Sequence, residues 1–282
     1  MSRLYFLNPI LACSFLLILG CSQPVSNPQN TFSLLPSVAE QYFKGEDSRI
    51  DVNTLKFAYS PTGDALPLLY GMTKQIQRVD QPENAQLEFS IQEDKSQSPE
   101  SYRLEITNEK IIIQAQSQAG LFYGFITLNQ LIEDAIAQDT PLPLLEINDA
   151  PKIAFRPIQI DVKHHLEKKS YYYDLLDELA QLKINGIILE IEDKLQFKRR
   201  PEVGSADALS IDEWRAISDY AIARNIKISP LVQGLGHASF VLKHEKNKHL
   251  RDDPASDWAF NPLDPETYEV QFDLYLDAME AF

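Results

Sequence analysis

The sequence contains only two cysteines, and both lie within its first 21 residues. The remaining 261 of its 282 residues therefore cannot form a disulfide framework or a cysteine-ligated metal site. Positive charge is also scarce, because 26 lysines and arginines stand against 41 aspartates and glutamates, for a net charge of −15. A chain this acidic is a poor partner for a phosphate backbone, so we expect no binding to nucleic acid.

Two other signals are missing. The sequence has no apolar run of the about 20 residues that a transmembrane helix requires. It also has no glycine-rich fingerprint after any predicted strand, so a dinucleotide-binding fold is unsupported. What is present is the composition of a folded protein, with 44% hydrophobic and 24% charged residues, which is enough to build a core.

Residues 1–20 have the pattern of a secretory signal peptide, with Arg3 near the start, a short apolar run and a small residue at the end. Residues 18–21, Ile-Leu-Gly-Cys, resemble the lipobox of bacterial lipoproteins, in which the cysteine becomes the lipidated first residue. We therefore expect Cys21 to anchor the protein in a membrane of the bacterial cell envelope, on the outer membrane or the periplasmic face if the cell is Gram-negative. A plain signal peptide with a chance cysteine is the alternative. Residues 21–35 are polar and contain prolines, as in a tether.

Residues 36–150 predict a small α+β domain. Strict alternation of apolar residues over 86–92 and 102–107 predicts two strands with one buried face, and a turn leads into a third strand over 110–115. Apolar residues recur every three to four positions over 118–134, which predicts an amphipathic helix, and we expect a shorter helix over about 67–79. We predict that these helices pack on one face of an antiparallel sheet.

Residues 151–282 alternate strand and helix. Apolar strands over 158–162, 187–191 and 226–232 are separated by a helix capped by Ser170 and by a helix that begins at the capping box Ser210-Ile-Asp-Glu213. A further helix is predicted from residue 265 onward. This order indicates parallel βα units, and we predict the first part of a (β/α)₈ barrel, an α/β fold whose functional groups follow the carboxyl ends of the strands. The polar residues at those ends are Asp161, Lys163, His164 and His165, then Glu190, Glu192 and Asp193, then Gln233 and His237.

Several motifs in this order resemble glycoside hydrolase family 20, the β-N-acetylhexosaminidases. Residues 119–131, Ala-Gly-Leu-Phe-Tyr-Gly-Phe-Ile-Thr-Leu-Asn-Gln-Leu, are similar to the end of the family's small N-terminal domain. Asp149-Ala-Pro151 and Phe155-Arg156 resemble the start of its catalytic barrel. Residues 230–237, Pro-Leu-Val-Gln-Gly-Leu-Gly-His, narrow the resemblance to the hexosaminidase D-like branch.

The resemblance implies a glycoside hydrolase that releases terminal β-linked N-acetylhexosamine from glycans or glycoconjugates, with no metal and no cofactor. In this family the substrate's own acetamido group attacks the anomeric carbon, so the reaction is a substrate-assisted exception to the two-carboxylate scheme. The chemistry needs an adjacent Asp-Glu pair after the fourth barrel strand, which we expect beyond Phe282. We therefore expect no catalytic residue within the chain, which we interpret as an incomplete and inactive portion of the enzyme. A non-catalytic envelope lipoprotein that binds glycan or a protein partner is the alternative.

The same resemblance, with the positions at the strand ends, assigns substrate binding to Arg156, Asp161, His165, Glu192, Asp193 and His237. Each residue also has a structural interpretation. Arg156 could form a salt bridge at the domain junction, and His237 could be a hydrogen-bonded structural histidine. Of the two tryptophans, Trp214 is predicted in the core, while Trp258 lies in a loop and its role as a sugar-stacking residue stays open.

Overall fold

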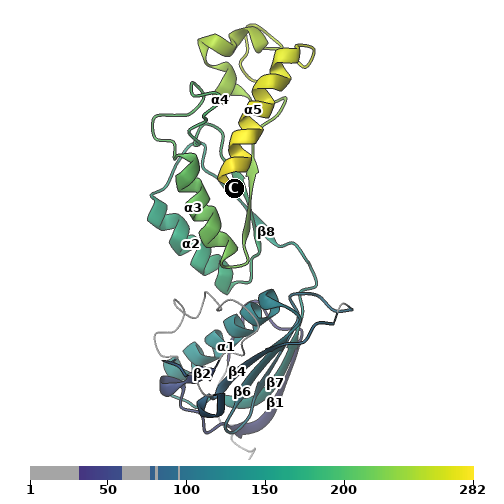
Figure 1. The fold of residues 1–282 in the computed structure, drawn as a ribbon, viewed down its shortest axis with the longest axis vertical. Helices are drawn as coiled ribbons and strands as arrows, with labels where there is room; N and C mark the ends of the chain where they lie inside the picture. Colours follow the sequence, from purple (N-terminus) through teal and green to yellow (C-terminus); the bar gives the residue numbers. More distant parts are fainter. Residues whose placement is uncertain (1–31, 59–76, 80–81, 95) are drawn as a thin grey trace, which may run out of the picture. The chain divides into compact units, whose positions relative to one another are not determined.

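The computed structural model describes residues 32–58, 77–79, 82–94 and 96–282 (Figure 1). Its first sheet has seven strands in the order β1-β7-β5-β6-β4-β2-β3. In chain order these strands are β1 (Glu40–Asp47), β2 (Lys56–Ala58), β3 (Gln77–Arg78), β4 (Leu87–Ile91), β5 (Tyr102–Ile106), β6 (Ile111–Ala115) and β7 (Pro143–Asp149). The short 3₁₀ turns η1 (Val52–Thr54) and η3 (Pro82–Asn84) lie between them.

The three strands predicted from alternation are confirmed as β4, β5 and β6. In β5 the side chains of Tyr102, Leu104 and Ile106 are buried, and the residues between them are only partly covered. Helix α1 (Gln118–Gln138) begins at the N-cap Ser117 and packs on β4, β5 and β6. The buried face of the sheet therefore lies against the predicted amphipathic helix.

The prediction of an antiparallel sheet is wrong, because the sheet is mixed. Strand β4 pairs in parallel with both β2 and β6, while β5 pairs antiparallel with β6 and β7. Alternation shows which face of a strand is buried, but it carries no information about the direction of the neighbouring strand. Most of the helix expected over about 67–79 lies outside the described residues, and Gln77–Arg78 at its end form β3.

The second sheet confirms the predicted parallel βα units. Strands β8 (Pro157–Asp161), β9 (Gly186–Glu190) and β10 (Lys227–Leu231) are parallel, with β9 in the middle and equivalent residues in register. The helices of this part are α2 (Lys169–Gln181), α3 (Ile211–Ile222), α4 (Ser239–Leu242), the 3₁₀ helix η4 (Glu245–Leu250) and α5 (Pro265–Ala281). Because the strands are in register, their carboxyl ends meet at one edge of the sheet.

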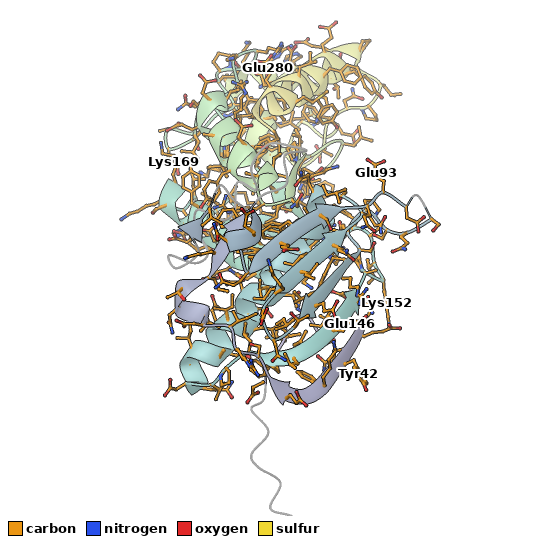
Figure 2. The ribbon with its side chains drawn as sticks, turned by 60° about the horizontal axis from the view of Figure 1, so that its bottom comes forward. Tyr42, Glu93, Glu146, Lys152, Lys169 and Glu280 are labelled. Carbon is orange, nitrogen blue, oxygen red and sulfur yellow. The ribbon has the colours of Figure 1, made fainter. Side chains whose placement is uncertain are left out.

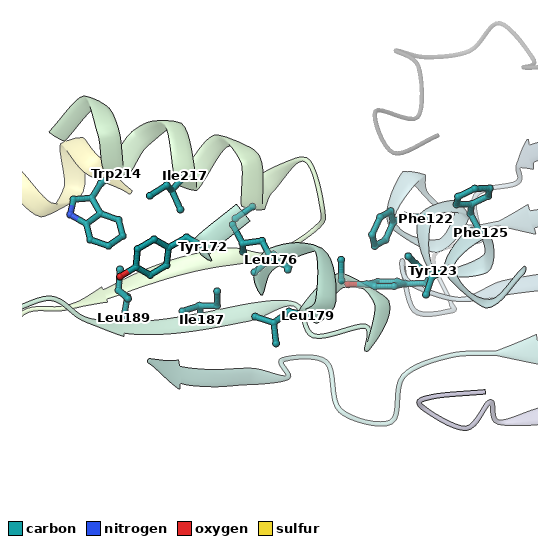
Figure 3. Packing of buried hydrophobic residues seen from close by; sticks show 14 of the residues in the cluster. Phe122, Tyr123, Phe125, Tyr172, Leu176, Leu179, Ile187, Leu189, Trp214 and Ile217 are labelled. Atoms are coloured by element: carbon teal, nitrogen blue, oxygen red, sulfur yellow. The ribbon is translucent and has the colours of Figure 1, made fainter. Parts of the chain in front are cut away.

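Trp214 occupies the core between α2, α3 and β9, as predicted (Figure 3). Its side chain is fully buried, its indole N–H donates to the carbonyl of Lys194, and its ring packs against Tyr172. Charged side chains lie at the surface instead, among them Lys169 at the start of α2 and Glu280 near the end of α5 (Figure 2). No helix in the described part of the chain is both long enough and apolar enough to span a membrane.

The two predicted helix caps have different outcomes. At α3 the capping box is confirmed, since the Ser210 hydroxyl accepts from the Glu213 N–H and the Glu213 carboxylate accepts from the Ser210 N–H. At α2 the prediction is wrong: Ser170 lies inside the first turn, and the N-cap is Lys168, which makes no side-chain cap. The chain enters α2 two residues earlier than the spacing of serine and leucines indicated.

We expect Ser210→Ala to lower the free energy of unfolding by about 1 kcal/mol, because it removes one side of the capping box. The same substitution at Ser170 is the matched control and should change stability by less than about 0.5 kcal/mol. Urea denaturation monitored by circular dichroism measures both. Equal losses in the two variants would contradict the assignment of the caps.

Candidate functional site

Four polar residues form a hydrogen-bonded group at the carboxyl ends of the three parallel strands. The ammonium of Lys163 lies 2.8 Å from Oε1 of Glu190 and 3.0 Å from Oδ2 of Asp161. The side-chain amide of Gln233 donates to the same Glu190 oxygen at 2.7 Å. We call Asp161, Lys163, Glu190 and Gln233 the strand-end cluster. It joins the ends of β8 and β9 to the loop after β10.

The electrostatics of the strand-end cluster keep its charges in place. The hydrogen bond from Lys163 lowers the pKa of Glu190 despite partial burial. Hydrogen bonds to Glu190 and Asp161 raise the pKa of Lys163. Burial alone would raise the pKa of Asp161, but the hydrogen bonds from Lys163 lower it overall. Two carboxylates and one ammonium therefore stay ionised at neutral pH, and such groups can orient the hydroxyls of a ligand through charge-assisted hydrogen bonds.

The two adjacent acidic residues after β9, Glu192 and Asp193, lie in different environments. Burial raises the pKa of Glu192, and the negative charges of Glu190 and Asp193 add to this effect. Asp193 is paired with cations, since its carboxylate lies 2.8 Å from the ammonium of Lys243 and 3.4 Å from that of Lys194. Asp193 thus ties the loop after β9 to the residue that follows α4, whereas Glu192 forms no salt bridge within the described part of the chain.

The two predicted histidines lie in exposed loops. His165 follows β8, its side chain is 78% exposed, and its Nε2 lies 2.9 Å from a carboxylate oxygen of Glu167. His237 follows β10, and its ring packs against Trp258 with a centroid distance of 5.0 Å. Both loops are at the carboxyl edge of the sheet, as predicted from the sequence.

Arg156 is the one predicted residue that the structure does not bring to this edge. It immediately precedes β8, five residues before Asp161, which is roughly 16 Å along an extended strand. Its guanidinium lies 2.7 Å from the carboxylate of Glu100 and donates to the carbonyls of Lys183 and Ile153. Asn185 donates to the other oxygen of the Glu100 carboxylate. These contacts favour the salt-bridge interpretation of Arg156 over contact with a sugar.

Lys163, Glu190 and Gln233 were visible in the sequence as polar residues at strand ends, but nothing assigned them a role. The available signal was their position, because each lies at the last residue of a strand or two residues after it. What the sequence could not show is that the Lys163 side chain reaches from the end of β8 to Glu190 on β9. Among the residues that the structure describes, no group of three or more acidic, histidine or cysteine side chains is arranged to hold a metal ion.

Comparison with known protein families gives a match over the first sheet. Residues 33–150 match the family described as glycosyl hydrolase family 20, domain 2. The β-hexosaminidase of Vibrio vulnificus is 26% identical over 195 residues, which cover 57% of this chain and 23% of the relative. Hexosaminidase D of Bos taurus is 34% identical over 98 residues, which cover 34% of this chain and 28% of the relative. The chain therefore matches less than a third of the length of these two relatives.

Solved structures resemble the chain over most of its length. The β-N-acetylhexosaminidase of Bacteroides fragilis aligns with a TM-score of 0.74 and 20% identity, covering 89% of this chain and 55% of that chain. The chitobiase of Flavobacterium johnsoniae aligns with a TM-score of 0.74 and 22% identity, covering 90% of this chain and 43% of that chain. These likenesses show that the fold is a small α+β domain followed by the first part of a barrel.

Proposed function

We propose that the chain functions as part of a glycoside hydrolase that releases terminal β-linked N-acetylhexosamine. The chain resembles glycosyl hydrolase family 20 in sequence and in fold. The match over residues 33–150 carries this proposal. In it, the described residues supply the N-terminal domain and three barrel strands, and the strand-end cluster positions the sugar. The substrate class comes from the relatives, which are named as hexosaminidases.

The chemistry of the strand-end cluster supports a positioning role. Glu190 and Asp161 are acceptors held ionised by Lys163, so they suit the hydroxyl groups of a sugar better than an anionic ligand. The adjacent acids after β9 are a poor acid/base couple, because Asp193 is already paired with Lys194 and Lys243. In the proposal, proton donation to the glycosidic oxygen belongs to the Asp-Glu pair that the family resemblance implies on a fourth strand.

The surface of the second sheet also supports a barrel. Strand β10 is an outer strand of the described three-stranded sheet, and α5, which follows α4 and η4, exposes apolar side chains along one face. These are Tyr268, Phe272, Tyr275, Leu276 and Met279. In a closed barrel every strand is paired on both sides, and each helix packs against its neighbours.

Glycan binding tests the proposal. We expect the protein to bind N,N'-diacetylchitobiose at least about tenfold more tightly than cellobiose, which has the same linkage but lacks both acetamido groups. Isothermal titration calorimetry measures the two affinities on one folded sample. Equal affinities, or no binding of either sugar, would contradict the proposed substrate class. Release of the chromophore from an aryl β-N-acetylglucosaminide by the same sample would contradict the assignment of catalysis to a fourth strand.

We propose in addition that Cys21 carries a lipid that holds the protein at the cell envelope. The lipobox-like residues 18–21 support this location, and they lie outside the described residues. In cells that process lipoproteins, Cys21→Ser should move the protein from the membrane fraction to the soluble fraction. Cys13→Ser is the matched control, because that cysteine lies within the predicted signal peptide, and it should stay with the membranes. A membrane-bound Cys21→Ser protein would refute the anchor.

A further inference from the structure

Two backbone positions at the carboxyl edge of the barrel strands are unusual. Five non-glycine residues in the described part of the chain have a positive φ. Three of them follow the ends of α1, α2 and α3, where a left-handed residue commonly closes a helix: Asp139, Lys183 and Asn225. The other two are Glu192, with φ 37°, and His237, with φ 56°, and they follow β9 and β10. Strain of this kind persists where surrounding contacts enforce it, and it gathers at binding sites.

The contacts that surround His237 centre on Trp258. The indole of Trp258 packs on the imidazole of His237, with an angle of 53° between the rings. The indole of Trp258 also rests on Gly236, where a Cβ atom would lie only 2.9 Å from the ring. Only glycine allows the ring to approach the backbone so closely. Even so, Trp258 is 53% exposed, so a large part of a rigidly supported aromatic ring faces solvent.

The segment that carries Trp258 is fixed to the loop after β10 by backbone hydrogen bonds. The Ala238 N–H donates to the Trp258 carbonyl at 2.9 Å, and the Phe260 N–H donates to the Leu235 carbonyl at 2.9 Å. Phe260 is buried beside it and pairs with Arg251 across a short antiparallel bridge. The exposed indole is therefore preorganised, and a ligand that covers it has little conformational entropy to remove.

We propose that Trp258, supported by Gly236 and His237, is a stacking platform for a pyranose ring of an oligosaccharide. A pyranose presents a face of C–H groups that packs on an aromatic ring, while its hydroxyls stay free for polar side chains. Gly236 and His237, which support the platform, belong to the same loop as Gln233, whose side-chain amide donates to Glu190 of the strand-end cluster. The identity of the sugar rests on the proposed function, but stacking needs only the apolar face of a pyranose.

The chain offers a direct spectroscopic test, because it contains only two tryptophans and Trp214 is fully buried. We expect a tetramer of β-linked N-acetylglucosamine to change the tryptophan emission of the wild type and of Trp214→Phe. Trp258→Ala should lose the change and bind the tetramer at least about tenfold more weakly by calorimetry. Trp258→Phe should recover part of the affinity, and Gly236→Ala should lower it by displacing the indole. Thermal unfolding of each variant establishes that it is folded.

The outcomes separate the platform from the proposed function. If the wild type binds the tetramer and folded Trp258→Ala binds it equally well, the platform is wrong and the proposed function stands. If cellotetraose binds as tightly as the tetramer and both are lost in Trp258→Ala, the platform is right and selectivity for N-acetylhexosamine is wrong. If neither sugar binds the wild type or changes its emission, both proposals are overturned.

Discussion

Replacing Lys183 with methionine is expected to lower the free energy of unfolding by about 3 kcal/mol. The Lys183 ammonium lies 2.9 Å from the carboxylate of Asp149 and 2.9 Å from the hydroxyl of Tyr102. The lysine and aspartate side chains are only 8% and 13% exposed. Methionine fills a similar volume and carries the same backbone cost at this left-handed position, so the substitution isolates the charge. It leaves a poorly solvated carboxylate without its cation.

The pH dependence of the same variant has a definite sign. Burial would raise the pKa of Asp149, but Lys183 and the hydrogen bonds from Ala39 and Tyr102 outweigh it, so the pKa lies below its usual value. A carboxyl group with a depressed pKa stabilises the fold above its unfolded pKa, and this contribution is lost as the pH falls through the folded value. The difference in stability between the wild type and Lys183→Met should therefore narrow below about pH 4.

Urea denaturation at pH 7 and at lower pH measures this prediction. Lys44→Met is the matched control, because Lys44 pairs with Glu105 at an exposed site and should cost less than about 1 kcal/mol. The double variant Asp149→Asn with Lys183→Met should recover part of the stability, since neither partner is then charged. A single Lys183→Met variant within about 1 kcal/mol of the wild type would show that the buried pair does not stabilise the fold.

Glu190→Gln is expected to weaken binding of N,N'-diacetylchitobiose at least about tenfold, because it removes the charge at the centre of the strand-end cluster. Glu190 accepts from Lys163 and Gln233 through one oxygen and from Gln159 through the other. A glutamine amide would direct its own N–H donors at one of these donor groups. In either orientation of the amide, the cluster loses at least one of these hydrogen bonds and its geometry changes.

Calorimetry on folded Glu190→Gln tests this role, with Glu245→Gln on the exposed side of η4 as the matched control. Lys163→Met combined with Glu190→Gln should add little further loss if the two residues act as one unit. Binding by the wild type should persist as the pH falls past 4.5, the ordinary pKa of a glutamate, because that of Glu190 is lower. If Glu190→Gln binds the sugar with wild-type affinity, the strand-end cluster is not part of the binding site. This conclusion does not depend on the outcome for the Trp258 platform.

Local patterns predicted the elements of this fold well. Alternation located β4, β5 and β6, the period of about 3.6 residues located α1, and the capping box located the start of α3. Trp214 was recognised as core from its place on an apolar helix face. Each of these signals involves residues within a few positions of one another, which is why one sequence is enough to read them.

Contacts between distant residues were beyond such patterns. The sequence placed Arg156 at a sugar by resemblance, whereas the structure pairs it with Glu100, which is 56 residues away along the chain. It marked Lys163, Glu190 and Gln233 as polar residues at strand ends, but their bonds span 27 and 43 residues. Ser170 had the right residue type for a cap, but the backbone enters α2 before it.

By itself, the sequence located strands β4, β5 and β6, helix α1 and the alternating strands and helices of the second sheet, and it showed that polar groups follow the barrel strands. It did not locate β1, β2, β3 or β7. The tertiary structure alone decided which of those groups meet. Parallel strands in register bring the ends of β8, β9 and β10 to one edge, and only there can Lys163 reach Glu190 or the Trp258 indole rest on Gly236 and His237. Periodicity reports the direction in which a side chain points, whereas a contact depends on where a second, distant segment has folded.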